Sequence, residues 1–422
     1  MTSQLRYARK TLLGPWMILA ALGIEVTNFM LRGMPWRGEG LWSVDWFAIS
    51  LFIIGPLAAG VAAIDAARLS RPGNLHLVVS VARRGRAYLW AAAWCAIPLS
   101  VLHLAVIGAA MIVGRVGHPS VSWWSLLGAA LVQCAGIVWY VCLGSAVGRY
   151  TNTLVAGLVG GVGGFALSYL VGGAFDSKPT FQLLNLGSAT ITMVGKSFNA
   201  GYLSAQAVLL LGTGALLLTL RVQGRSGRRL PTGAAAVAAV LVVAAIAIAP
   251  TALPSQRYDS TPHAPTSCTG TAPQICLYPE HRRYAAAINN SIDTLAKAAQ
   301  AHGYSRLVPA RIIEESRSYH PSGPGVFALY LPAQVYEGGQ FTVQDAATAM
   351  LTPSHCAFVQ NPSVGGIDVD RFTANYFSLV TTWLHLAGVD DVMTPVPVRL
   401  LTPKQADTVL NDFAGCRLDA SL

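Results

Sequence analysis

The chain has 422 residues, of which 53% are hydrophobic and 11% are charged, and its formal net charge is +10. This charge is unevenly divided, because residues 1–250 carry a net +13 and residues 251–422 a net −3. A net positive charge in the apolar part of a chain alone is typical of membrane topology and of contact with anionic lipid headgroups. It argues against a nucleic-acid-binding protein.

Seven apolar segments lie within the first 250 residues, and each is long enough for a membrane-spanning helix. They are residues 12–31, 46–64, 87–114, 123–148, 153–175, 202–220 and 230–250. The first segment is longer than the core of a signal peptide and is followed by Arg32, so we expect it to remain as a helix. An odd number of crossings places the two ends of the chain on opposite sides of the membrane.

The distribution of Lys and Arg predicts the orientation, because these residues resist translocation out of the cytoplasm. If the N-terminus is inside the cell, thirteen basic residues lie in cytoplasmic segments and five in external loops. The five external residues are Arg32, Arg37, Arg115, Lys178 and Lys196. We therefore expect a cytoplasmic N-terminus and an extracytoplasmic C-terminal domain.

The first, third and fourth segments contain polar residues, which are costly in lipid and often mark a pathway. We identify four pathway candidates: Glu25, Asn28, His103 and Gln133. Two other interpretations remain open: Glu25 pairing with Arg32, and the His and Gln side chains forming hydrogen bonds between helices.

The longest cytoplasmic loop spans residues 65–86 and follows the second segment. Asp65 and Arg68 continue the second helix beyond the membrane, and Asn74 is placed to cap a short amphipathic helix. The apolar face and basic end of that helix comprise Leu75, Val78, Val79, Ala82, Arg83, Arg84 and Arg86. This pattern fits either an interfacial helix that lies on lipid or an element that docks on a cytoplasmic partner.

Glycines of the fifth segment form two GxxxG pairs, Gly157 with Gly161 and Gly160 with Gly164. Such pairs let helices approach closely in lipid, either within one subunit or across a dimer.

Residues 190–197 (TITMVGKS) have some likeness to a phosphate-binding loop, but the first position is Thr190 and a glycine is required there. We therefore expect this chain to bind no nucleotide or other cofactor by itself.

Four cysteines fall in the C-terminal part, in a compartment expected to be oxidising. Four cysteines allow three pairings, of which we favour Cys268 with Cys276 and Cys356 with Cys416. A zinc site is the alternative, but no CxxC or HxxxH spacing accompanies these residues.

The C-terminal part predicts mainly helices with short extended pieces. Helices are expected at residues 280–302, 346–351, 370–388 and from Thr402 towards Cys416, and a strand is expected at residues 326–331. Clusters at Glu280 and His281, Glu314 and Glu315, and His355 would suit a hydrolase. Because neither HExxH nor GxSxG is present, we expect these clusters to be solvated, with no catalytic residue and no metal site.

Residues 55–68 (GPLAAGVAAIDAAR), at the end of the second segment and before the basic loop, resemble membrane (permease) subunits of ABC-2-type ATP-binding-cassette exporters. The six segments before residue 221 and residues 185–190 (NLGSAT) share this resemblance. Residues 268–281 (CTGTAPQICLYPEH) are similar to extracytoplasmic extensions on some bacterial permeases of this kind.

The resemblance implies an all-α, six-helix membrane core over residues 1–222. The chain departs from the six-helix pattern in a cytoplasmic linker and seventh transmembrane helix over 223–250, and we expect a small mainly α (α+β) extracytoplasmic domain over 251–422. The resemblance also implies that the 65–86 loop couples to a separate cytoplasmic ATPase, that ATP acts through this partner, and that two membrane subunits form a homodimer or heterodimer in the bacterial plasma membrane. The alternative function is a non-transporting membrane protein whose external domain senses or binds a ligand or envelope component.

Overall fold

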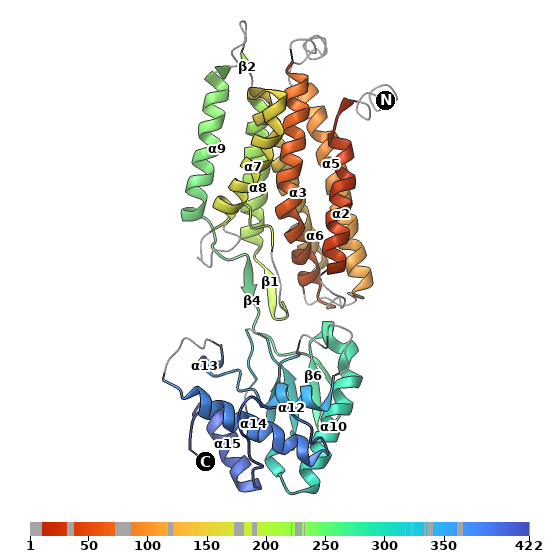
Figure 1. The fold of residues 1–422 in the computed structure, drawn as a ribbon, viewed down its shortest axis with the longest axis vertical. Helices are drawn as coiled ribbons and strands as arrows, with labels where there is room; N and C mark the ends of the chain where they lie inside the picture. The colour runs from red at the N-terminus through yellow and green to blue at the C-terminus, as the bar shows by residue number, and fades with distance from the viewer. Residues whose placement is uncertain are drawn as a thin grey trace.

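The computed structural model describes most of the chain, in fifteen segments. They are residues 11–31, 38–71, 86–116, 121–172, 181–187, 192–220, 222–223, 230–231, 233–316, 318–321, 323, 325–332, 335, 341–360 and 366–421. A long helical bundle and a separate C-terminal domain lie end to end (Figure 1). We call the end of the bundle that faces this domain the proximal end, and the opposite end, which carries β2, the distal end.

The bundle consists of helices that run roughly side by side along its long axis (Figure 1). Its elements are η1 (Gly14–Trp16), α2 (Met17–Leu31), α3 (Gly40–Leu69), α5 (Arg86–Val113), α6 (Trp123–Tyr150), α7 (Thr153–Gly172), α8 (Ala200–Thr219) and α9 (Gly233–Ala252). A short hairpin of β2 (Val222–Gln223) and β3 (Leu230–Pro231) precedes α9 at the distal end.

Five of these helices, α3, α5, α6, α8 and α9, are long and apolar enough to cross a membrane among the residues that the structure describes. The shorter apolar helices α2 and α7 pack in the same bundle. Large apolar side chains on the outside of the bundle are exposed, including Met30, Ile112, Trp124, Leu154 and Val208. Such a surface is stable in lipid and unusual on a soluble monomer, so the bundle has the properties of an integral membrane protein.

Helix α3 is the centre of the bundle, because it packs against α2, α5, α6 and α7. Its 30 residues extend about 45 Å, which exceeds the hydrocarbon thickness of about 30 Å. Small residues make this packing possible. A Cβ atom added at Gly144 of α6 would lie 2.0 Å from the carbonyl oxygen of Ala59, and one at Gly160 of α7 would lie 2.8 Å from the Cβ of Ala63.

The two GxxxG pairs therefore face α3 of the same chain. Ile64 of α3 lies 2.7 Å from a Cβ placed at Gly157, and Pro56 and Gly60 approach Gly161 and Gly164. The structure thus shows an intrachain seam for these glycines. By contrast, α9 packs mainly on α8, at the edge of the bundle.

The C-terminal domain contains a four-stranded sheet in the order β5 (Ser267–Thr269), β6 (Gln274–Leu277), β7 (Arg311–Glu314) and β8 (Val326–Leu329). Strands β5 and β6 are antiparallel, whereas β6, β7 and β8 are parallel. The expected strand at 326–331 is confirmed as β8. The remaining strands have only three or four residues, too few for a reliable alternating pattern in sequence.

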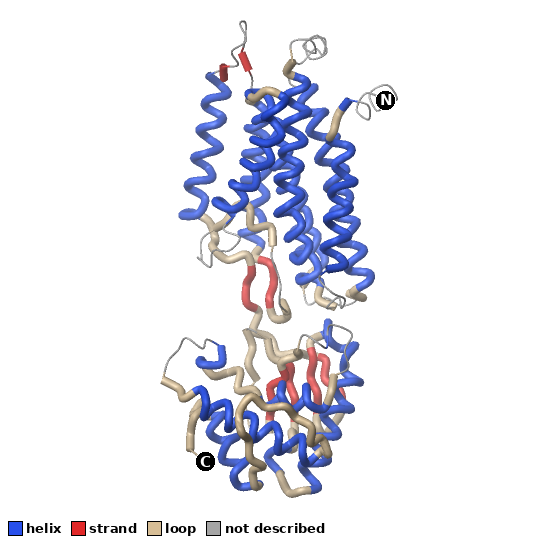
Figure 2. Tube along the Cα trace, in the orientation of Figure 1, coloured by secondary structure: helices blue, strands red, loops and turns tan. Residues whose placement is uncertain are grey.

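The domain also contains several helices, and Figure 2 shows that its strands are few compared with its helices. They are η3 (Pro279–Tyr284), α10 (Ala285–Ala301), η4 (Ser305–Leu307), α12 (Val343–Leu351), α13 (Ala357–Gln360), α14 (Val369–Leu386) and α15 (Pro403–Ala414). The predicted start signals are confirmed, because Thr342 with Asp345 and Thr402 with Gln405 form capping boxes. The core includes Ile288, Ile312 and the fully buried Trp383.

Both favoured disulfides are present, Cys268 with Cys276 and Cys356 with Cys416. The first joins the paired strands β5 and β6, and the second joins the chain before α13 to the end of α15. Cys95, Cys134 and Cys142 are buried thiols within the bundle, as their apolar surroundings in the sequence predict. The disulfides suit an oxidising, extracytoplasmic compartment for this domain.

The seam between α3 and α7 predicts an asymmetric response to two neighbouring substitutions. Gly160→Ala introduces a Cβ atom within 3.0 Å of α3, and overpacking of this kind costs about 1–3 kcal/mol. Gly163→Ala on the same helix meets nothing within 4 Å. We therefore expect thermal unfolding of the detergent-solubilised protein to shift to lower temperature for Gly160→Ala alone; equal shifts would contradict the intrachain seam.

Candidate functional site

Three of the four predicted pathway residues form one hydrogen-bonded chain inside the bundle. Nδ1 of His103 on α5 lies 2.8 Å from Oε1 of Glu25 on α2, and its Nε2 lies 2.9 Å from Oε1 of Gln133 on α6. Nε2 of Gln133 donates to the carbonyl oxygens of Val44 and Leu186, both at 3.1 Å. All three side chains are buried.

The bonds of Gln133 constrain the protons in this chain. Because its Nε2 donates to two carbonyls, its Oε1 must accept, so Nε2 of His103 carries a hydrogen. One proton is then shared between Nδ1 of His103 and Oε1 of Glu25, and the pair is neutral overall wherever that proton resides. Oε2 of Glu25 has no partner among the described residues. Of the two interpretations left open above, the structure favours hydrogen bonds between helices, and Arg32 lies outside the described residues.

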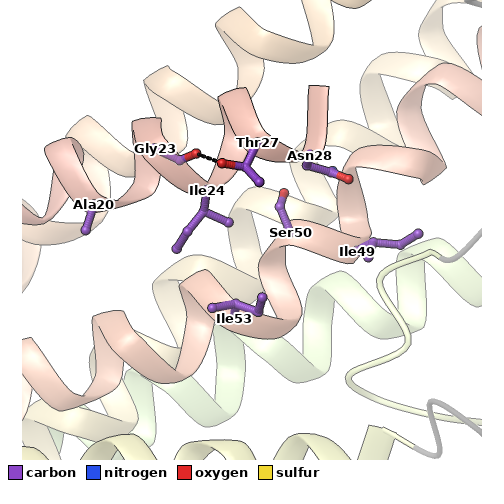
Figure 3. Close-up of a pocket in the computed structure, with 8 residues that line it drawn as sticks. All are labelled: Ala20, Gly23, Ile24, Thr27, Asn28, Ile49, Ser50 and Ile53. Carbon is purple, nitrogen blue, oxygen red and sulfur yellow. Dashed lines mark hydrogen bonds between the residues drawn. The ribbon is translucent and has the colours of Figure 1, made fainter. Parts of the chain in front are cut away.

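Asn28, the fourth candidate, lines a cavity of about 460 Å³ between α2 and α3 (Figure 3). The remaining lining residues are mostly apolar or small: Ala20, Gly23, Ile24, Thr27, Ile49, Ser50 and Ile53. Gly23, Thr27 and Ile53 are exposed, so the cavity opens towards the side of the bundle. Within the described residues, the buried Nδ2 of Asn28 has no hydrogen-bond partner.

A buried ion pair ties the start of the C-terminal part to α3. Nη2 of Arg257 donates to Oδ1 of Asp45 at 3.0 Å, and the Tyr258 hydroxyl donates to Oδ2 of the same carboxylate. Arg257 also donates to Oε1 of Gln206 at 3.0 Å and to the carbonyl of Leu186 at 2.8 Å. Burial alone would lower the pKa of Arg257, but the charge of Asp45 raises it, so the guanidinium stays charged.

Residues 181–187 are a non-helical segment whose backbone lies among these side chains. The carbonyl of Gln182 accepts from the Tyr202 hydroxyl at 2.9 Å, and Nε2 of Gln206 donates to two further carbonyls of the segment at 2.9 Å. Side chains from α6, α8 and Arg257 thus satisfy backbone that would otherwise be unpaired in an apolar bundle. The segment includes the first three residues of the 185–190 loop; residues 188–190 lie outside the described residues.

A second buried cluster, which we call the latch, joins the domain directly to the start of α3. Nε2 of His281 lies 3.2 Å from Oε1 of Glu39, and its Nδ1 hydrogen-bonds Oε1 of Glu314 at the end of β7. Glu39 precedes α3 and also accepts from the Thr192 hydroxyl at 2.8 Å and from the Met193 backbone N–H at 2.5 Å. The latch therefore brings together four separate segments of the chain, at Glu39, at Thr192 and Met193, at His281 and at Glu314.

The expectation that these acidic and histidine clusters are solvated is wrong for four residues. Glu280, His281, Glu314 and Glu315 are all buried. His281 and Glu314 are buried in the contact with Glu39 of the bundle, whereas Glu315 is buried within the domain beside Ser354 and His320. Burial alone would lower the pKa of His281, but the charge of Glu314 and hydrogen bonds to Glu314 and Glu39 raise it to about 10. His281 therefore keeps its proton at neutral pH and hydrogen-bonds both Glu314 and Glu39, while burial raises the pKa of Glu314.

Strands β1 (Lys196–Phe198) and β4 (Tyr258–Ser260) pair antiparallel between the bundle and the domain (Figure 2). Arg283 adds a direct contact, since its Nη1 donates to the carbonyl of Gly114 at 2.7 Å. The junction therefore combines backbone pairing with the two buried ionic clusters.

Of the predicted coupling residues, the structure describes Asp65, Arg68 and Arg86, and these lie at the distal end of the bundle. Both carboxylate oxygens of Asp65 accept from the backbone N–H groups that open the first helix, at Leu13 and Gly14, at 2.8–3.0 Å. Arg68 lies in the last turn of α3. Leu75, Val78, Val79, Arg83 and Arg84 lie outside the described residues, and Arg86 begins α5.

His355 does not form a metal site with its neighbours. Its ring lies close to Cys356 and Cys416, but those sulfurs form a disulfide and offer no thiolate.

Glu39, Asp45 and Arg257 are functional candidates that sequence reasoning missed. The usable signal for the two carboxylates is their rarity, since residues 1–250 hold only five acidic groups and two of them, Glu39 and Asp45, lie shortly before the apolar segment 46–64. Their partners could not be identified from sequence, because the pairs are separated by more than 200 residues.

No protein-family model, curated protein or solved structure matches this chain. The geometry of the bundle and its junction must therefore support any functional conclusion.

The Asp45–Arg257 pair predicts a large stability effect. Asp45→Asn leaves the guanidinium of Arg257 buried without a counter-charge, and breaking a buried pair this way costs about 3–5 kcal/mol. The exposed pair of Asp293 and Lys297 is the control, and Asp293→Asn should cost less than about 1 kcal/mol. The free energy of unfolding, measured by chemical denaturation of both variants, tests this. Similar decreases in the two variants would refute the importance of the junction pair. The double variant Asp45→Leu, Arg257→Leu removes both charges and should regain part of the free energy that Asp45→Asn loses.

The latch predicts that stability falls with rising pH. The native state keeps the His281 proton up to about pH 10, whereas the unfolded chain releases it near the ordinary value of 6.5. This contribution is therefore complete below pH 6.5 and is lost as the pH rises to about 10. The charged groups packed on the imidazole are Glu39 and Glu314, with Glu280 beside it in sequence.

The measurement is the unfolding temperature of the solubilised protein between pH 6 and 10. We expect the unfolding temperature of His281→Gln to fall less with rising pH than that of the wild type. His302→Gln, at an exposed position, should show the same fall as the wild type. An unaltered pH profile in His281→Gln would show that the latch does not hold this proton.

Proposed function

We propose that the chain is the membrane-spanning subunit of an ATP-driven transporter of the ABC-2 exporter type. In this proposal residues 1–222 form the six-span core, α9 is a seventh span that carries the domain to the outside, and a separate cytoplasmic ATPase binds the loop between α3 and α5. Two such subunits, identical or related, assemble in the bacterial plasma membrane.

The continuity of α3 is the observation that carries this proposal. The helix leads from the basic loop at the distal end to Glu39 and Asp45 at the proximal end, without a break in its 30 residues. A rigid helix that is fixed at both ends transmits displacement along its length. Movement of the loop by an ATPase would therefore reach the latch and the Asp45–Arg257 pair.

The distal end also has the character of a cytoplasmic face. Arg68, Arg71 and Arg149 lie there, at or just beyond the ends of α3 and α6. Asp65 fixes the first helix to α3 at the same end, so the coupling loop would act on two helices together. This arrangement supports the orientation expected from the distribution of basic residues.

The Glu25–His103–Gln133 chain supplies a polar group to a pathway in this proposal. It links α2, α5 and α6, and one oxygen of Glu25 lacks a partner among the described residues. A relative movement of these helices would expose the chain to a substrate or to water.

A second candidate function is a non-transporting membrane protein whose external domain binds a ligand. The large cavity next to the buried Glu315 in the C-terminal domain favours this alternative. The two functions differ in one respect that can be measured, since only the transporter requires an ATPase partner.

Affinity purification of the tagged chain from its native membrane tests the proposal. We expect an ATPase to copurify, and we expect the combined change of Arg83, Arg84 and Arg86 to Glu to abolish its binding, because a coupling helix contacts the ATPase through this loop. A matched control changes Arg6, Arg9 and Lys10 to Glu, which alters charge equally on the same face.

Two outcomes would contradict the proposal. If no ATPase copurifies with the wild-type chain, the transporter assignment is wrong. If the ATPase remains bound to the loop variant, or is lost equally in the N-terminal control, the assignment of the coupling element is wrong.

A further inference from the structure

The C-terminal domain contains a large cavity at the edge where the parallel strands β7 and β8 end. Its volume is about 810 Å³, within the range of about 300–1,000 Å³ that small-molecule sites occupy. Glu315 and Ser316 directly follow β7, and Tyr330 directly follows β8. Ligands commonly bind beyond the carboxyl ends of parallel strands, because loops and helix ends converge there.

Glu315 is the central charged group of this cavity. Its side chain is buried, accepts a hydrogen bond from the Ser354 hydroxyl and lies 3.5 Å from Nδ1 of His320. The preceding residue, Glu314, belongs to the latch, because consecutive side chains at the end of a strand point in opposite directions. At the end of β7, Glu314 thus contacts His281 of the latch on one side and Glu315 lines the cavity on the other.

The charges around the cavity favour a cation. Asp345 lines it and occupies the capping box of α12, so a carboxylate stands at the helix N-terminus where an anion would otherwise bind. Among the described lining residues there is no Lys or Arg. The half-exposed ring of Tyr330 offers a further favourable contact for an ammonium group.

The remaining polar groups suit a hydroxylated ligand. Ser316, Thr348 and Thr352 line the cavity with hydroxyls, each of which both donates and accepts hydrogen bonds. Apolar surface, to which Pro332, Ala349 and Val359 contribute, makes up the rest of the lining, so the cavity suits a ligand that has apolar faces as well as hydroxyls. An anionic ligand would be repelled by Glu315 and Asp345, which both line the cavity.

The arrangement favours binding over hydrolysis. Ser354 and His320 both face the same carboxylate oxygen, so the hydroxyl lacks the imidazole base that activates a serine nucleophile. Metal binding is not favoured either, since the described part of the chain brings no third ligating side chain to Glu315 and His320.

We propose that this cavity binds a small molecule that carries an ammonium group and several hydroxyls, as an amino sugar does, with Glu315 as the partner of the ammonium. The assignment is independent of the transporter proposal. The cavity adjoins the junction, because the Ser318 hydroxyl, two residues beyond Ser316, donates to the carbonyl of Gly195 at 2.6 Å.

Isothermal titration of the full-length protein in nanodiscs tests this site with glucosamine, glucose and glucose 6-phosphate. We expect glucosamine to bind at least about tenfold more tightly than glucose, and glucose 6-phosphate not to bind, because a hydrogen bond between charged groups contributes about 1.5–3 kcal/mol. Glu315→Gln should weaken glucosamine binding by at least about tenfold, and the exposed Asp293→Asn should leave it unchanged.

A second variant tests the site independently, in case Glu315→Gln does not fold. Thr348 is exposed on α12 and lines the cavity, so Thr348→Trp should fill it without disturbing the core, and glucosamine binding should be lost while the circular dichroism spectrum stays the same. The proposal is overturned if glucosamine does not bind, if glucose or glucose 6-phosphate binds as tightly, or if a folded Glu315→Gln or Thr348→Trp variant binds normally.

Discussion

The need to pair charge that is buried away from water governs how the two parts of this protein fit together. Arg257 lies on the side of the C-terminal part, but its partner Asp45 lies in α3, and neither is accessible to solvent. His281 makes the same connection through Glu39. An unpaired ion in such surroundings costs several kcal/mol, so separation of the two parts is unfavourable unless water reaches both partners. The geometry of the junction follows from this requirement.

Helix α3 connects this junction to the rest of the molecule. Its proximal end carries Asp45 and follows Glu39, its middle packs against glycines of α6 and α7, and its distal end holds Asp65 against the first helix. Close backbone packing leaves little room for the helix to bend, so it responds as a unit. A helix with these properties suits a protein in which a change at the distal end of the bundle must reach the junction with the C-terminal domain, or the reverse. The transporter proposal and the ligand-binding alternative both require such a connection.

The general architecture could be predicted from sequence because it depends on local properties. Long apolar segments predicted the helices of the bundle, Thr342 and Thr402 marked helix starts, and spacing in the domain favoured the correct disulfides. The short strands β5, β6 and β7 were not located, since three or four residues carry too little pattern. Burial of Glu314 and Glu315 was also missed, because nothing local shows that another segment will cover them.

By itself, the sequence determined which segments are apolar, which ends carry positive charge and where cysteines and capping residues lie, because these features act through neighbours along the chain. It identified Glu25, His103 and Gln133 singly as unusual polar residues. Only the tertiary structure decided that these three side chains are linked by hydrogen bonds and that Asp45 pairs with Arg257. It also decided that Glu39 and Glu314 both bind the imidazole of His281. The physical reason is that pairing of buried charge depends on which segments pack together, and packing depends on shape across the whole molecule.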